Sequence, residues 1–141
     1  MSRTRGKTAI VGVGEIPNGR YPDRGAIHFA LDAARMAIRD AGIDKHEIDF
    51  VIPTSALFSA QFSTELSTCR LVEELGLDAV SANVTVFSGG SSSTNALRIA
   101  SALIETGRAR NILFVHCDKL GTGVTAQGLS LIHISEPTRP Y

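Results

Sequence analysis

Residues 81–94 read SANVTVFSGGSSST, and this stretch decides the fold. Its first half alternates between two faces, with Val84 and Val86 on one side and Thr85 on the other, which is the period of a β-strand. A glycine and serine turn follows, and from Ala96 to Ile104 the apolar residues recur at helical spacing. A strand that passes through a tight turn into a helix is the repeating unit of parallel sheets, so we expect an α/β protein.

The same alternation of strand and helix continues on both sides of this stretch. Apolar runs predict strands at 8–13, 49–52 and 111–116, and we expect Pro53 to close the second of them. Amphipathic spacing predicts helices at 27–41 and from an N-cap at Ser63 to Leu75, and a capped turn at 44–47. Three glycines stand where the helices should stop, at Gly42, Gly76 and Gly107. The sequence therefore predicts a single lobe with a parallel-dominated sheet and helices on both faces.

Composition narrows the class of protein. The chain has 141 residues, 43% apolar and 20% charged, as one globular domain does. Its 14 basic and 14 acidic residues balance, so nothing favours nucleic acid or an anionic membrane as a partner. Two cysteines, Cys69 and Cys117, are too few for a disulfide framework or a zinc site. No apolar run is long enough for a secretion signal or a membrane span, so we expect a cytoplasmic protein without a metal.

The last residues do not continue the pattern. Residues 129–141 read LSLIHISEPTRPY, with neither an amphipathic period nor a turn signal. Through Arg139 this run resembles the translation of a transposase-type sequencing adapter, and a genuine frayed terminus is the alternative. We therefore expect the authentic domain to be 1–128 and to continue beyond Gly128 in the complete protein.

The turn after the 81–87 strand is the strongest chemical feature. A helix that begins there presents unpaired backbone N–H groups and a positive dipole end, which suit a phosphate or a carbonyl oxygen that becomes negative. The alternative is an ordinary serine N-cap after a glycine turn. Neither this turn nor Gly12-Val-Gly14 completes a phosphate or dinucleotide fingerprint, since the lysine of the first and the third glycine of the second are missing.

The other candidate groups are isolated. His116 and Cys117 are neighbours that should point to opposite faces of a strand, whereas His116 and Asp118 share a face and could pair. We expect Cys69 to be a small buried hydrophobe on its helix. His28 and His46 suit solvated or structural roles.

Several short motifs, in order and spacing, resemble the start of a thiolase-superfamily protein. They are IVGVG at 10–14, YP at 21–22, AA at 33–34, DAGI at 40–43, ID at 48–49, NVTV at 83–86 with its turn, AL at 96–97 and GR at 107–108. The branch most similar is that of sterol-carrier-protein-type thiolases and lipid-transfer proteins. The similarity covers about residues 7–123. It implies the first of two repeated halves, so 1–128 would be a truncated N-terminal domain.

This resemblance implies an elbow whose cysteine takes an acyl group from a coenzyme A thioester, with no bound cofactor. The nucleophile position falls on Gly90, where there is no cysteine, and the neighbouring Ser91 is the candidate catalytic residue. We expect the substrate to meet the elbow residues Gly89, Gly90, Ser91 and Ser92. The function implied is acyl transfer or carbon–carbon cleavage in lipid metabolism. A non-catalytic protein that binds lipid or acyl-coenzyme A, or acts as a scaffold, is the alternative.

The resemblance also implies partners. Cysteine-less members of the family break carbon–carbon bonds by retro-aldol chemistry together with a small OB-fold protein. A homodimer is implied as well, in which the strand before the elbow pairs with its copy across a two-fold axis. The residues of that interface would be Asn83, Val84, Thr85, Val86 and Phe87. The family's second-half histidine and cysteine are not in this chain.

Overall fold

The computed structural model describes residues 7–54 and 64–118. In chain order the elements are α1 (Ala26–Ala41), the short helix η1 (Lys45–Glu47), β1 (Phe50–Thr54), α2 (Thr64–Leu75), β2 (Ala82–Asn83), α3 (Ser92–Glu105) and β3 (Ile112–His116). The expected N-cap Ser63 and the expected foreign run 129–141 lie outside the described residues. Within the described residues, none of the helices is long and apolar enough to cross a membrane.

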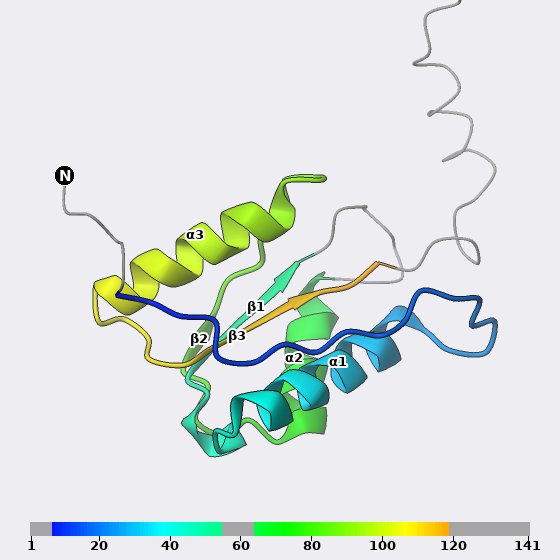
Figure 1. Cartoon of the computed structure of the whole chain (residues 1–141), viewed down its shortest axis with the longest axis horizontal. Helices are drawn as coiled ribbons and strands as arrows, with labels where there is room; N and C mark the ends of the chain where they lie inside the picture. The colour runs from blue at the N-terminus through cyan, green and yellow to red at the C-terminus, as the bar shows by residue number, and fades with distance from the viewer. Residues whose placement is uncertain (1–6, 55–63, 119–141) are drawn as a thin grey trace, which may run out of the picture.

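The sheet is parallel and has the order β2-β1-β3. Helices α1 and α2 lie on one face and α3 lies on the other (Figure 1). Strands β1 and β3 pair along their whole length, from Phe50 opposite Ile112 to Thr54 opposite His116. The α/β class and the helices on both faces, expected from the alternation of apolar patterns, are confirmed.

Each face of the sheet has its own apolar cluster, because successive residues of a strand point to opposite sides. Val51, Leu113 and Val115 belong to the cluster under α1 and α2. The cluster under α3 contains Phe50, Ile52, Val86, Ala96 and Ala109, with Ile112 and Phe114 packed against it. This assignment of faces decides which side chains meet at the end of the sheet.

Helix α1 follows its sequence pattern closely. The buried residues are Ala26, Ile27, Ala30, Leu31 and Ala34. Gly42 ends the helix in the left-handed conformation with φ 65°, and its N–H donates to Arg39 O at 3.2 Å. Gly76 and Gly107 have the same positive φ after α2 and α3. Only glycine adopts this conformation freely, so the helix stops predicted from the sequence are confirmed.

The strand expected at 8–13 is wrong. This segment runs extended along α1, and the side chains of Ile10, Val11 and Val13 are 71%, 62% and 66% exposed. Both sides of the central strand β1 are occupied by β2 and β3, and the N–H of Val13 donates instead to Asp40 Oδ2 at 2.9 Å. Gly12 and Gly14 let the segment lie against the helix backbone, and a Cβ atom on Gly14 would be 2.0 Å from Ala33 O.

Two strand boundaries also differ from expectation. Pro53 does not close β1 but lies within it, and its carbonyl accepts from Val86 N at 3.3 Å. Proline lacks the N–H that would continue the parallel ladder toward β2. The expected strand 81–87 is accordingly reduced to the two residues of β2 and one isolated bridge between Thr54 and Val86.

Two helical positions differ as well. Cys69 is exposed rather than buried, because the inward stripe of α2 consists of Thr68, Leu71 and Leu75, and Cys69 lies one position around the helix from it. Leu97, expected on the apolar stripe of α3, is 42% exposed. Helix α3 is the only helix over its face in the described part of the chain, so one of its sides has nothing to pack on.

Candidate functional site: the elbow before α3

The elbow is the turn of residues 88–92 between the end of the β2 segment and α3. Gly89 has φ 57°, which makes the sharp reversal possible without strain. The turn closes through Ser91 N to Ser88 O at 3.3 Å and Ser92 N to Gly89 O at 3.0 Å. The Ser92 hydroxyl is buried, donates to Gly89 O at 2.6 Å and accepts from Ser88 N at 2.9 Å. Ser92 therefore holds the two ends of the elbow together.

Beyond the turn, the first helical turn of α3 offers hydrogen-bond donors. The backbone N–H groups of Ser93 and Thr94 make no hydrogen bond within residues 7–54 and 64–118, whereas Asn95 N already donates to Ser91 O at 3.0 Å. Ser88, Gly90 and Ser91 are exposed, so the elbow is open to a ligand. Such donors at a helix N-terminus favour an oxygen that carries negative charge.

The elbow residues divide into structural and accessible groups. Ser91 is exposed, and its hydroxyl donates to Ser88 O at 2.8 Å, so it is ordered in place. The roles of Ser91 as nucleophile and of Gly89, Gly90 and Ser92 in substrate binding stay predictions. The Ser92 hydroxyl already donates to Gly89 O and accepts from Ser88 N, so its one proton is not available to a ligand.

Other polar side chains gather at the same edge of the sheet. Thr54 ends β1, is 1% exposed, and donates from Oγ1 to Val86 O at 2.6 Å. At the end of β3, His116 Nε2 lies 3.4 Å from Asp118 Oδ2. The pairing of His116 with Asp118, open at the sequence level, is therefore realised. The elbow and this pair lie at the carboxyl ends of parallel strands, where α/β proteins gather ligands.

Cys117 is not part of this edge. It is buried on the α1 side and its thiol donates to Ala26 O at 3.1 Å. Burial, and then the charge of Asp118, raise the pKa of Cys117 from 9.0 to about 11. A thiol with so high a pKa is a poor nucleophile near neutral pH, so Cys117 does not replace the missing elbow cysteine.

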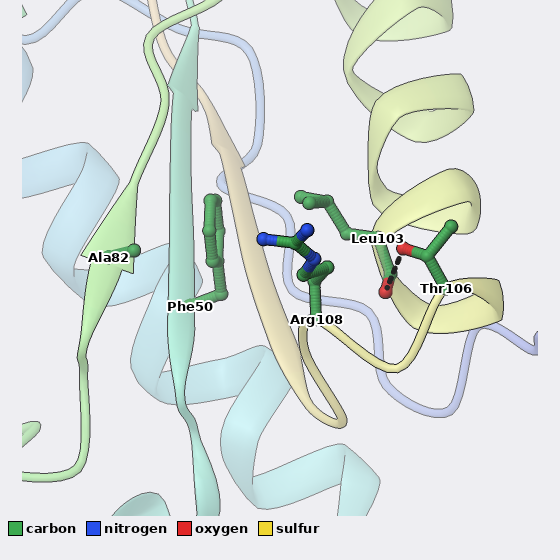
Figure 2. Close-up of a pocket in the computed structure, with 5 residues that line it drawn as sticks. All are labelled: Phe50, Ala82, Leu103, Thr106 and Arg108. Atoms are coloured by element: carbon green, nitrogen blue, oxygen red, sulfur yellow. Dashed lines mark hydrogen bonds between the residues drawn. The ribbon is translucent and has the colours of Figure 1, made fainter.

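A hollow of about 660 Å³ lies at the opposite, amino-terminal edge of the sheet. Figure 2 shows Phe50 on β1 and Ala82 on β2, with Leu103 in the last turn of α3 and Thr106 and Arg108 in the segment that follows it. The Thr106 hydroxyl donates to Leu103 O at 3.1 Å, and none of these side chains is a general acid, base or nucleophile for neutral pH. This hollow had no signal in the sequence, and it lies at the other end of the sheet from the elbow.

No cluster of three or more metal-ligating side chains occurs within the described residues.

The predicted dimer strand lies at the open edge of the sheet, where β2 pairs only with β1 in this part of the chain. Asn83 and Phe87 are exposed, and Val84 and Val86 face α3. An exposed strand edge is able to accept another strand, so the dimer stays a prediction.

The chain is similar to known proteins over only part of their length. No protein-family profile matches the chain. It is 35% identical over 105 residues to beta-ketoacyl-acyl-carrier-protein synthase III of Campylobacter fetus subsp. fetus, a match that covers 72% of this chain and 30% of that protein. The chain thus spans less than a third of the length of the curated relatives that it matches.

Comparison with solved structures identifies the fold. The acetyl-CoA acetyltransferase of Syntrophomonas wolfei superimposes with a TM-score of 0.66 at 28% identity, over 74% of this chain and 27% of that one. The Ltp2-ChsH2(DUF35) aldolase superimposes with a TM-score of 0.69 at 22% identity, over 89% of this chain and 32% of that one. The chain has the thiolase-like fold. Synthase, acetyltransferase and aldolase are all similar to it, so the sterol-carrier-protein branch is not singled out.

Proposed function

We propose that this chain is the elbow-bearing part of a thiolase-like enzyme that acts on acyl thioesters, and that the elbow receives the thioester carbonyl of an acyl-coenzyme A. The observation that carries the proposal is the pair of unpaired N–H groups, on Ser93 and Thr94, beside an exposed glycine at position 90. A carbonyl oxygen set against such donors is polarised, and negative charge that develops on it is stabilised. A Cβ atom added at Gly90 would meet nothing within 4 Å, so the space beside the turn is open.

The relatives support this choice of chemistry. The synthase and the acetyltransferase similar to this chain are named for acyl-group chemistry, at 35% and 28% identity. The absence of a thiol at Gly90 means that the acyl group is not carried on a cysteine at this elbow. The proposal therefore assigns to the elbow the binding and polarisation of the thioester, and leaves Ser91 as the hydroxyl that stands nearest to the nucleophile position.

Two partner hypotheses belong to the same proposal. The open edge of β2 suits pairing with a second copy through residues 83–87. A small OB-fold partner is the other hypothesis, and its support is the similarity in fold to an aldolase named as a complex with ChsH2(DUF35).

The test is a titration of isotope-labelled chain with acetonyl-coenzyme A, a stable ketone analogue of acetyl-coenzyme A. Backbone amide resonances of residues 88–95 should shift, those of Ser93 and Thr94 most. Gly90→Val should weaken binding at least ten-fold, because its branched side chain would fill the open space beside the turn that the proposal gives to the substrate. Gly25→Ala, at the start of α1, should bind as the unchanged chain does. Unshifted resonances at 88–95 at saturating analogue would refute the proposal.

A further inference from the structure

His116 and Asp118 form a pair at the end of β3 that the proposed function leaves unused. Ile112 and Phe114 pack against the cluster under α3, and Leu113 and Val115 belong to the opposite cluster. Because strand residues alternate between faces, His116 follows Ile112 and Phe114 and is placed on the α3 face. Cys117 confirms the alternation, since its thiol reaches α1 on the other side.

Helix α3 begins at the same edge and on the same face. The arrowheads of β1 and β3 point toward the end of the molecule where α3 starts (Figure 1). Thr54 lies between the elbow and the histidine, because it is bridged to Val86 on one side and in register with His116 on the other. With neighbouring strands about 4.8 Å apart, the backbones of Val86 and His116 are separated by roughly 10 Å. A thioester that reaches both would lie across the end of β1, over Thr54, on the α3 face of the sheet.

The pair has the arrangement of a base with its orienting carboxylate. Asp118 Oδ2 lies 3.4 Å from Nε2 of His116, where its negative charge attracts a proton carried on that nitrogen. Nδ1 is then left as the proton acceptor. The His116 side chain is 34% exposed and that of Asp118 is 14% exposed, so the ring is accessible while its partner is largely covered.

We propose that His116, positioned by Asp118, is the base that removes a proton from the carbon next to the thioester carbonyl of an acyl-coenzyme A held at the elbow. The proposal rests on the proposed function. In this step the C–H bond breaks and the proton goes to Nδ1. The electron pair of that bond is delocalised onto the carbonyl oxygen, which faces the N–H groups of Ser93 and Thr94. No oxidant, metal or second substrate is needed.

Deuterium exchange isolates this step from any later one. In D2O the protonated base exchanges with solvent, and returning a deuteron gives acetyl-coenzyme A labelled in its methyl group with no other bond broken. The intact chain should accelerate this labelling above buffer, as followed by NMR. His116→Gln should slow it by about a hundred-fold, within the usual contribution of a general base.

The chain offers a matched control in a second histidine–aspartate pair. His46 Nδ1 lies 2.6 Å from Asp78 Oδ1, but His46 belongs to η1, before β1, at the amino-terminal edge of the sheet. His46→Gln should therefore leave the labelling rate unchanged. Asp118→Asn should slow labelling by a smaller factor than His116→Gln, while acetonyl-coenzyme A still shifts the amides of 88–95. If Asp118 only held the fold together, its loss would weaken binding as well as labelling.

The outcomes separate the two proposals. Amide shifts at 88–95 together with labelling that His116→Gln abolishes support both. Amide shifts with labelling that is equal in His116→Gln, or absent from the unchanged chain, overturn the role of His116 and leave the proposed function standing. No shifts at 88–95 overturn both. If His116→Gln does not fold, the ring resonances of His116 in the unchanged chain decide, because a ring that does not respond to acetonyl-coenzyme A contacts no substrate.

Discussion

Asp49 and Arg110, 61 positions apart in the chain, are joined by two hydrogen bonds from the Arg110 backbone N–H to the two carboxylate oxygens of Asp49, at 2.9 and 3.1 Å. The N–H of Asn111 adds a third, to Oδ1 at 3.1 Å. Asp49 directly precedes β1 and Asn111 directly precedes β3, so one carboxylate aligns the starts of the two strands. The register of Phe50 with Ile112, and hence of Thr54 with His116, follows from this contact.

Asp49→Ala should lower the free energy of unfolding by about 1–3 kcal/mol, because it removes the acceptor of two backbone donors. Asp49→Asn, which keeps one acceptor oxygen, should lose less. Urea unfolding measures both. Asp23→Ala is the control, since Asp23 is exposed in the turn before α1. Equal stability of Asp49→Ala and Asp23→Ala would contradict the role of this carboxylate.

Gly14→Ala should detach the N-terminal segment from α1. A Cβ atom there would lie 2.0 Å from Ala33 O, and backbone atoms of a helix cannot yield by so much. We expect the Val13 amide, which donates to Asp40, to exchange with solvent at least ten-fold faster. Gly25→Ala meets nothing closer than 3.5 Å and should leave this exchange unchanged. A protected Val13 amide in Gly14→Ala would show that the close packing is wrong.

Ser92→Ala should destabilise the elbow by about 1–3 kcal/mol, since it leaves the Ser88 N–H without its acceptor in a partly buried turn. Ser91→Ala removes the hydroxyl that donates to Ser88 O, but the Ser91 N–H still donates to that oxygen. The loss in free energy of unfolding should therefore stay below about 1 kcal/mol. Thermal unfolding ranks the two variants. The opposite order would mean that Ser91, and not Ser92, holds the turn.

The two cysteines should differ in reactivity. Thiolate is the form that iodoacetamide attacks, and a pKa raised from 9.0 to about 11 makes the thiolate of Cys117 about a hundred-fold scarcer below pH 9. Burial blocks the reagent further, whereas Cys69 is exposed. Mass spectrometry after brief alkylation near pH 8 should therefore find one labelled site in the folded chain and two in urea. Equal labelling of both in the folded chain would contradict the burial of Cys117.

Asp32 should contribute to stability only above acid pH. Hydrogen bonding to Arg24 lowers the pKa of Asp32 below 3.8, and Arg35 lies 3.3 Å from its other oxygen. A carboxyl with a lowered folded pKa stabilises the fold above its unfolded pKa, and this contribution is lost as pH falls through the folded value. The pair is about 40% exposed, so the effect of Asp32→Asn near neutral pH should be below about 1 kcal/mol. Melting temperatures of the chain and the variant should converge near pH 2. A constant difference would contradict this linkage.

The sequence predicted elements well where one short-range pattern governs them. The stripe of α1, its stop at Gly42 and the almost continuous apolar run of β3 depend on residues within a few positions of one another. The predictions that failed concern segments whose structure depends on residues far away in the chain. The 8–13 run has the composition of a covered strand, yet β1 has its neighbours elsewhere, and the glycines that interrupt the run fit it to a helix. Pro53 and the two-residue β2 are the same kind of case, because a missing N–H matters only where a partner strand needs it.

The site was predicted in part for the same reason. A glycine and serine turn before an amphipathic helix is local, so the elbow could be located from residues 81–104 alone. Which serine holds it could not be known, since Ser91 and Ser92 are neighbours and only their directions in space separate an exposed hydroxyl from a buried one.

By itself, the sequence determined the α/β class, the order of the main helices and strands and the place of the elbow, because hydrophobic periodicity and glycine conformations act through neighbouring residues. The sequence also placed His116 and Asp118 on one face and Cys117 on the other, but only the tertiary structure decided that α3 covers the first face and α1 the second. Those relations depend on the pairing of β3 with β1, 62 positions apart at Asp49 and Asn111. A contact between such distant residues is set by which packing of the whole sheet has the lowest free energy, and no local pattern encodes it.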